Sequence, residues 1–282
     1  MAPRPSISIV WLKRDLRLRD HEAIAAALKD AHPVLFLFCY EPEQVRDDHY
    51  SPRHFRFIDD SIADLNRQLH IHQTSILAPY CEALKVFQLL HQQCNIKAVY
   101  SLQETGIAIT YQRDKHVAAW LKQHSIPWHE YQCNGVQRGL RNRKRWVHDW
   151  HAYMAQPTHT FEPTNKAFVP AARVTEWAAA LPSWEPEYAE PAANFQRGGE
   201  AEAWKTLQTF LHQRAGAYFK SISKPAASRT HCSRLSPYLA WGNLSTAGVS
   251  AGTAGPRSGK VSPAAGAIWL SAALALPFHS EV

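Results

Sequence analysis

Short apolar runs alternate with helix-length periodic segments through residues 1–133, and this alternation restricts the fold of the chain most strongly. The runs at residues 6–12 (SISIVWL) and 33–40 (PVLFLFCY) are apolar on both faces, as strands are when helices cover both sides of a parallel sheet. Residues 51–69 instead repeat their apolar side chains at helical spacing. Residues 1–133 are therefore predicted to form a doubly wound α/β domain with a parallel sheet.

The remaining elements of this domain follow from the same patterns. We expect helices over residues 82–94 and 111–123, and strands over residues 98–102 and 128–132. Asp20 is placed to cap a helix that runs through HEAIAAALKD. Ser51 followed by Pro52 is a good helix start.

The chain changes character after residue 133. Residues 137–154 (QRGLRNRKRWVHDWHAYM) are strongly basic and rich in Trp and Tyr, and six prolines then interrupt residues 157–191. Prolines at this spacing prevent long helices. We therefore expect a basic helix and a Pro-rich interdomain linker over residues 134–198.

The basic run is a candidate nucleic-acid surface, because it lies next to Trp146 and Trp150. Its cations can bind phosphate in a sequence-independent, salt-sensitive way, and the net charge of +7 also favours polyanions. The alternative is a solvated helix face that covers the seam between the domains. The candidate DNA-binding residues are Arg138, Arg141, Arg143, Lys144 and Arg145.

A second domain, helical in pattern, begins at residue 199. Apolar residues recur at helical spacing over residues 199–216, and we expect the start of a helical domain over residues 199–245. From residue 246 to residue 282, Ala, Gly, Ser and Pro dominate the composition. This composition predicts a low-complexity tail, which is either disordered or translated out of frame, or else a genuine regulatory extension.

Other features exclude several kinds of site and location. The five cysteines include no C-x-x-C pair, so we expect reduced thiols, and the His pairs at 70/72 and 148/151 lack further ligands at metal-binding spacing, so we expect no metal site. No Walker, G-x-S-x-G or G-x-G-x-x-G pattern supports a hydrolase, kinase or dehydrogenase. The first residues lack the apolar core of a signal peptide, and no stretch reaches roughly 20 apolar residues. We therefore expect a cytoplasmic protein without a membrane partner.

Three segments, in this order along the chain, carry a family resemblance. The first is WLKRDLRLRDHEAI at residues 11–24, and the second is RGGE at residues 197–200, followed by Phe210 and Leu211. The third is Tyr218 with CSRLSPYLAWGNLS at residues 232–245. Together they resemble the photolyase/cryptochrome family over residues 6–245. The resemblance implies an α/β domain followed by the start of an all-α FAD-binding domain.

The third segment implies the cofactor site. By position, the resemblance assigns FAD contacts to Tyr218, Ser233, Arg234, Leu235 and Ser236. A pyrophosphate needs small donors at a helix start, and the hydroxyls of Ser233 and Ser236 can supply them. Cys232 stands where the family usually has Thr, which weakens one expected hydrogen bond. No catalytic residue is assigned.

The first segment has two interpretations. Lys13, Arg14 and Arg17 follow the first strand at its carboxyl end, where α/β sheets bind ligands. Alternatively, an ion pair of Asp15 ties this loop to neighbouring elements, and in the family the motif is largely architectural.

The resemblance implies light-driven repair of pyrimidine photoproducts in DNA by electron transfer from FAD. The alternatives are a blue-light photoreceptor, or a nucleotide- or antenna-binding α/β module that uses a free crevice at the carboxyl ends of the strands. The family's helical domain continues beyond the match at Ser245, so we expect weak or no retention of FAD and no repair by this chain. The residues distinguish neither the cyclobutane dimer from the 6-4 photoproduct nor the identity of any antenna pigment.

Overall fold

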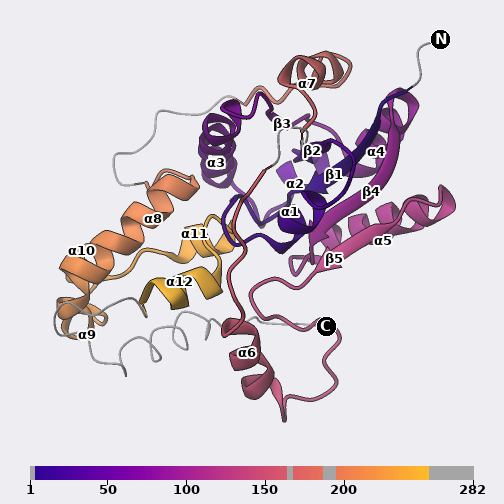
Figure 1. The fold of residues 1–282 in the computed structure, drawn as a ribbon. Helices are drawn as coiled ribbons and strands as arrows, with labels where there is room; N and C mark the ends of the chain where they lie inside the picture. Colours follow the sequence, from indigo (N-terminus) through magenta and orange to yellow (C-terminus); the bar gives the residue numbers. More distant parts are fainter. Residues whose placement is uncertain (1–3, 164–167, 187–194, 254–282) are drawn as a thin grey trace.

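The computed structural model describes residues 4–163, 168–186 and 195–253, and its centre is a five-stranded parallel sheet (Figure 1). The strand order is β3-β2-β1-β4-β5, and every neighbouring pair is parallel. The strands are β1 (Ser6–Trp11), β2 (Val34–Leu37), β3 (Ile76–Leu77), β4 (Asn95–Leu102) and β5 (Trp128–Tyr131). From β1 the chain adds β2 and β3 on one side and then β4 and β5 on the other side. This strand order confirms the predicted doubly wound sheet.

Helices cover both faces of the sheet, so its strands have two separate cores. Alternate residues of β1 and β2, such as Val10 and Phe36, pack with α1 (Glu22–Ala27) and α3 (Pro52–His70). The intervening residues, such as Ile9 and Leu35, pack with α4 (Ala83–Gln93) and α5 (Ala108–Gln123). A short helix, α2 (Pro42–Val45), follows β2. Burial on both faces explains why these strands are continuously apolar.

The helix starts are partly as expected. Helix α3 begins at Pro52 after Ser51, as predicted. The N-cap of α1 is His21 rather than Asp20, and its Nδ1 accepts a hydrogen bond from the backbone N–H of Ile24 at 3.3 Å. Asp20 instead has a φ of 51° and ends the loop that precedes the helix, so the prediction that it caps the helix was wrong.

Part of the expected linker belongs to the α/β body. Helix α7 (Ala171–Ala178) begins after Pro170 and packs on β3, and its Val174 and Trp177 are buried in the same core as α4 and α5. The backbone N–H of Val169 donates to the carbonyl of Val34 at 2.9 Å. Proline at a helix start leaves the helix intact, which is why this Pro-rich stretch still contributes to the core.

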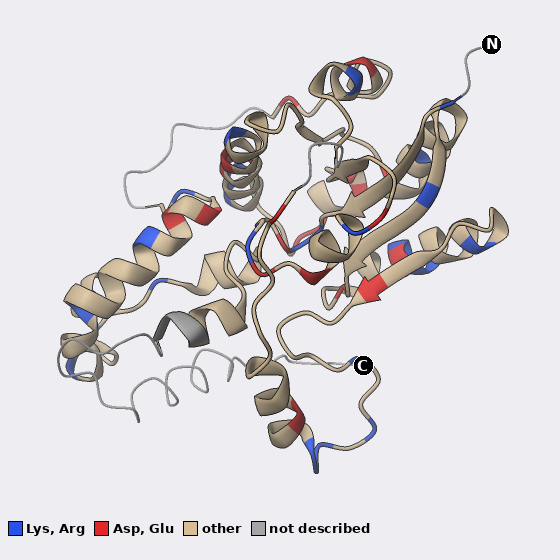
Figure 2. Cartoon of the chain, viewed as in Figure 1, with Lys and Arg blue, Asp and Glu red and all other residues tan. Residues whose placement is uncertain are grey.

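The basic residues precede a helix rather than forming one. Helix α6 (Trp146–Met154) begins after the cations of residues 138–145, which the structure describes as turns and irregular backbone. Figure 2 shows this blue-coloured segment at the periphery of the molecule, next to α6. The expectation of a basic helix face is therefore wrong for these residues.

The helical segment comprises five α-helices and two further helical turns, and it extends past the expected boundary at residue 245. Its helices are α8 (Glu200–Thr209), a π-helical turn (Phe210–Arg214) with a 3-10 turn (Ala215–Ala217), α9 (Tyr218–Ser221), α10 (Pro225–His231), α11 (Ser236–Ala240) and α12 (Thr246–Thr253). Ser245 Oγ accepts from the backbone N–H of Gly248 at 2.8 Å, and Val249 is buried in the core. Residues 246–253 are thus structured, and the rest of the predicted tail lies outside the described residues.

The described residues contain no helix long and apolar enough to cross a membrane.

All five cysteines are free thiols, and Cys39, Cys81 and Cys94 are buried. Burial raises the pKa of the Cys94 thiol to about 12, so this side chain stays protonated and unreactive at neutral pH.

Candidate functional site

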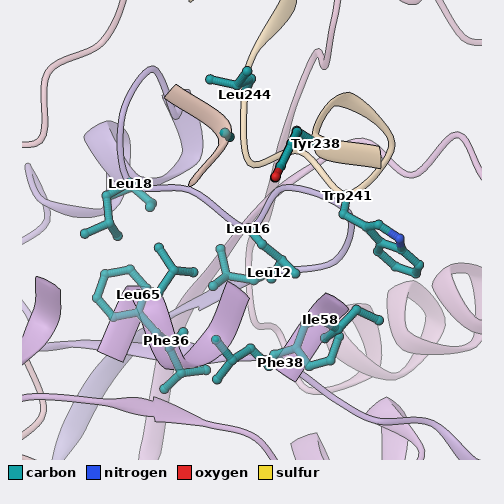
Figure 3. Packing of buried hydrophobic residues seen from close by; sticks show 14 of the residues in the cluster. Leu12, Leu16, Leu18, Phe36, Phe38, Ile58, Leu65, Tyr238, Trp241 and Leu244 are labelled. Carbon is teal, nitrogen blue, oxygen red and sulfur yellow. The ribbon is translucent and has the colours of Figure 1, made fainter. Parts of the chain in front are cut away.

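The loop at residues 13–20, which follows β1, holds the helical segment against the α/β body. The backbone N–H of Leu16 donates to the carbonyl of Trp241 at 3.0 Å, and Arg17 Nη1 donates to the carbonyl of Gly242 at 2.9 Å. Figure 3 shows Leu16 between Tyr238 of the helical segment and Phe36 of the sheet. We call residues 13–20 the clamp loop.

Asn243 and Gly242 allow this close approach. Asn243 is fully buried, and its Nδ2 donates to the carbonyl of Leu16 at 2.8 Å and to Ser61 Oγ at 3.1 Å. Gly242 has a φ of 68°, and a Cβ there would lie 2.2 Å from the carbonyl oxygen of Arg14. The G-N-L-S part of the third motif therefore builds the contact between the two parts of the chain.

The second motif serves the same contact. Glu200 is 2% exposed, and its carboxylate accepts backbone hydrogen bonds from Leu18 at 2.9 Å and Arg19 at 3.3 Å. A Cβ on Gly198 would lie 1.9 Å from the carbonyl oxygen of Phe57. The two glycines thus let the segment approach α3, and Glu200 binds the clamp loop.

Asp15 ties the clamp loop internally. Its carboxylate contacts Nε2 of His21 at 3.0 Å and accepts from the backbone N–H of Lys13 at 2.5 Å, and both side chains of the pair are buried. Burial acts to raise the pKa of Asp15, but the hydrogen bond and the charge of His21, with other contributions, bring it below its ordinary value. Of the two interpretations of the first motif, these contacts support the architectural one.

The crevice at the carboxyl ends of the strands is filled by a buried ion cluster. Arg113 of α5 contacts Glu41 at 2.7 Å, Glu104 at 3.0 Å and Asp114 at 2.8 Å, and Lys13 contacts Asp114 at 3.0 Å. The surrounding carboxylates raise the pKa of Arg113 despite its burial. A cavity of about 10 Å³ beside the cluster has room for one water molecule, and a second of about 20 Å³ is lined by Leu102 and Gln132 at the ends of β4 and β5. The expectation of a free crevice was wrong, because charged side chains occupy it.

The predicted FAD contacts lie in and beside the loop that joins α10 to α11. Ser233 is half-buried, Ser236 is exposed at the start of α11, and Tyr218 of α9 is buried. Leu235 differs from the others, because its side chain is 6% exposed and packs in the core with the α/β body. Only the backbone of Leu235 can face a cofactor.

Two arginines define the shape of this loop. Arg214 Nη1 donates to the carbonyl of Cys232 at 2.6 Å, and Nη2 donates to the carbonyl of Ser233 at 3.4 Å. Arg234 has a φ of 58° and exchanges hydrogen bonds with Gln196 at 2.8 and 3.2 Å. Burial and the nearby charge of Arg234 lower the pKa of Arg214. An anion next to these two guanidinium groups would stabilise both charges.

Sequence reasoning missed Arg214, Glu200 and Asn243 as site-building residues. Glu200 and Asn243 lie inside quoted motifs, so their position was a usable signal, but Arg214 lies in no motif. The predicted DNA-binding residues are separate from this loop and flank α6 instead. Within the described residues, no group of three or more His, Cys, Asp or Glu side chains could hold a metal ion.

The chain is similar in sequence to known proteins. Residues 8–179 match the family model described as DNA photolyase. A deoxyribodipyrimidine photo-lyase of Synechococcus sp. is 26% identical over 250 residues, which cover 84% of this chain and 51% of that protein. The chain thus spans about half the length of this curated relative.

Two solved structures share the fold. A cryptochrome of Synechocystis sp. PCC6803 superposes with a TM-score of 0.74 at 19% identity, over 97% of this chain and 60% of that one. An archaeal photolyase from Sulfolobus tokodaii, solved with two FAD molecules, superposes with a TM-score of 0.63 at 19% identity, over 89% of this chain and 55% of that one. Because the family model matches more than half of the residues of this chain, the chain belongs to the DNA photolyase family.

Proposed function

We propose that the chain is a photolyase-type flavoprotein sequence whose function is the light-driven repair of pyrimidine photoproducts in DNA, with FAD bound against the α10–α11 loop. The observation that carries this proposal is the α10–α11 loop itself, in which Arg214 holds the backbone carbonyls of Cys232 and Ser233. Burial and the nearby charge of Arg234 lower the pKa of Arg214, so the loop concentrates positive charge beside the serine hydroxyls of the third motif. The two functional units are then the α/β body, which includes α7, and the helical segment that begins at residue 199.

The donor set fits the phosphates of FAD. A diphosphate carries negative charge and accepts hydrogen bonds, and this loop offers two hydroxyls and two guanidinium groups. Arg214 uses donors to hold the backbone of Cys232 and Ser233, so its role is to position the loop and to supply positive charge. When bound, FAD would supply the electron-transfer chemistry. The roles of the chain's own residues are to bind and orient the phosphates.

The residues assigned to FAD would hold only its phosphates. Ligand sites for molecules of this size bury about 70–90% of the ligand surface. The flavin and adenine rings have no assigned partner in the described residues. We therefore expect this chain to retain FAD weakly and to repair no photoproduct by itself.

A chimera tests the proposed function. Residues 1–245 would be joined to the remaining C-terminal half of the Synechococcus photo-lyase, with gel filtration and circular dichroism as controls for folding. A folded, yellow chimera that removes thymine dimers from an oligonucleotide only under light is the expected result. A folded chimera without flavin absorbance contradicts the proposal.

The same assay distinguishes the alternatives. A chimera that binds flavin and is photoreduced, but repairs no photoproduct, favours the blue-light photoreceptor. The fold is shared with the Synechocystis cryptochrome, so it is compatible with this alternative. A nucleotide- or antenna-binding function of the α/β body alone has less support, because the ion cluster of Arg113 fills the crevice at the strand ends.

A further inference from the structure

Residues 136–150, which we call the basic arm, carry most of the excess charge of the chain. The arm contains five basic residues and one acidic residue, Asp149, for a net charge of +4 out of the chain's +7. It includes the start of α6 and the irregular segment before it, and it lies at the periphery of the molecule (Figures 1 and 2). The proposed FAD loop uses none of these residues.

Most of the charge in the arm is not neutralised by the fold. Arg138 contacts Glu130 at 2.7 Å, and Arg145 lies 3.8 Å from Asp149. Arg141, Arg143 and Lys144 are exposed, and none has an ion-pair partner among the described residues. Clustered cations without carboxylates repel one another and destabilise a free chain, so an anionic partner would relieve them.

Apolar side chains are exposed between these cations. Val136 and Leu140 are each 42% exposed, Val147 is 56% exposed, and Trp146 is 38% exposed. The rings of Trp146 and Trp150 lie 6.4 Å apart between centroids and are tilted by only 27°. Exposed aromatic rings among cations match the composition of surfaces that bind nucleic acid by phosphate contacts and base stacking.

We propose that the basic arm binds the sugar–phosphate backbone of nucleic acid without sequence preference, and that Trp146 stacks on an unpaired base where one is present. The partner is a nucleic acid rather than an anionic membrane because of where the charges lie. A helix that lies on a membrane carries Lys and Arg along its polar face. Helix α6 contains no Lys or Arg, and the cations precede it in irregular backbone. This binding requires neither FAD nor a photoproduct.

The test measures binding of the full chain to undamaged, fluorescein-labelled DNA of 24 nucleotides by fluorescence anisotropy, from 50 to 200 mM salt. The test variant replaces Arg141, Arg143 and Lys144 with Ala. The matched control removes the same charge elsewhere, through Ala at Lys85, Lys97 and Lys122, which are exposed on α4, β4 and α5. Thermal unfolding verifies that both variants are folded.

The arm variant should bind at least about tenfold more weakly than wild type at 50 mM salt, and the slope of log affinity against log salt should fall by about 2–3. The control variant should keep nearly the full slope. Trp146→Ala should weaken binding of a single strand by about tenfold, as expected for one lost stacking contact, and leave duplex binding unchanged.

Three results would overturn the proposal. Equal losses in the arm and control variants would mean that only the overall charge attracts DNA. Undiminished DNA binding by the arm variant would exclude the arm as the surface. Wild-type binding to vesicles containing phosphatidylserine that the arm variant loses, with DNA binding intact, would assign the arm to a membrane instead.

Discussion

Replacing Gly242 with Ala tests whether the clamp loop and the helical segment form one rigid contact. Gly242 has a φ of 68°, a conformation that costs a residue with a Cβ about 1–2 kcal/mol. A Cβ there would also lie 2.2 Å from the carbonyl oxygen of Arg14 and 2.5 Å from Cα of Asp15. Both contacts are with backbone, so the loop itself must move.

That movement disturbs two hydrogen bonds across the contact. The backbone N–H of Leu16 donates to the carbonyl of Trp241, and Arg17 donates to the carbonyl of Gly242 itself. A neutral hydrogen bond contributes about 1 kcal/mol and a bond to a charged donor about 1.5–3 kcal/mol. With the cost of the backbone conformation, Gly242→Ala should destabilise the chain by about 3.5–6 kcal/mol if both hydrogen bonds are lost.

The assay is urea unfolding followed by tryptophan fluorescence. The matched control is Gly139→Ala, because Gly139 has a φ of 72° but a Cβ there would meet nothing within 4 Å. The control should lower the free energy of unfolding by about 1–2 kcal/mol, the conformational cost alone. Equal effects of the two substitutions would refute the close packing inferred at Gly242.

Three further predictions concern buried polar groups. Asn243→Ala should destabilise the chain by about 1–3 kcal/mol in urea unfolding, because it leaves the buried carbonyl of Leu16 without its donor. The control is Asn142→Ala on the exposed basic arm, which should have no measurable effect. Arg113→Met should destabilise the chain by about 3–5 kcal/mol in the same assay, because it leaves the buried carboxylates of Glu41 and Glu104 without their cation. The loss should be larger at pH 8 than at pH 5, since protonation of these carboxylates relieves their repulsion. Equal losses at the two pH values would contradict this. Hydrogen bonds from Ser8 and other donors outweigh burial and lower the pKa of Asp30 to about 2, below its ordinary 3.8, so stability present above about pH 4 should be lost as the pH falls toward 2. Thermal unfolding of Asp30→Asn should lack that part of the acid dependence, and an unchanged acid profile would contradict the assignment.

The parallel sheet was predictable because burial on both faces leaves a continuous apolar run. Strands β1, β2 and β5 lie inside predicted runs, and β4 begins at Asn95, three residues before its predicted start. Helices α3 and α4 each bury an apolar stripe, whereas the short helix α2 buries no side chain and lay in no predicted element. Strand β3 contains only Ile76 and Leu77, too few residues to show any periodicity. Its existence depends on pairing with Phe36 and Leu37 of β2, which is a tertiary effect.

The helix ends and the boundary at residue 245 depended on contacts that local patterns do not contain. His21 caps α1 because its other ring nitrogen is held by the buried Asp15. Helix α12 forms in a stretch of Ala, Gly and Ser because Val249 reaches the core. Low-complexity composition is a poor guide where one apolar residue can dock onto an existing surface.

The candidate FAD site was predicted from motif position, and the structure shows that several residues of the same motifs serve the fold. The quoted motifs do contain the loop of Ser233 and Ser236, yet Glu200 and Asn243 in the same motifs hold the chain together. Leu235 serves the core, and Arg214, outside every motif, shapes the loop. Motif position identifies where residues matter, whereas burial and partners show whether they serve the fold or a ligand.

The most direct test of the central claim compares the binding of FAD with that of riboflavin, which has the same flavin ring system but no phosphate. Titration of the full chain by isothermal calorimetry should show weak binding of FAD and much weaker binding of riboflavin. The double substitution of Ser233 and Ser236 with Ala should reduce binding of FAD, and Ser183→Ala, an exposed serine of the α/β body, should not. Equal affinity for the two ligands, or full binding of FAD by the double variant, would contradict the assignment of the α10–α11 loop to the phosphates of FAD.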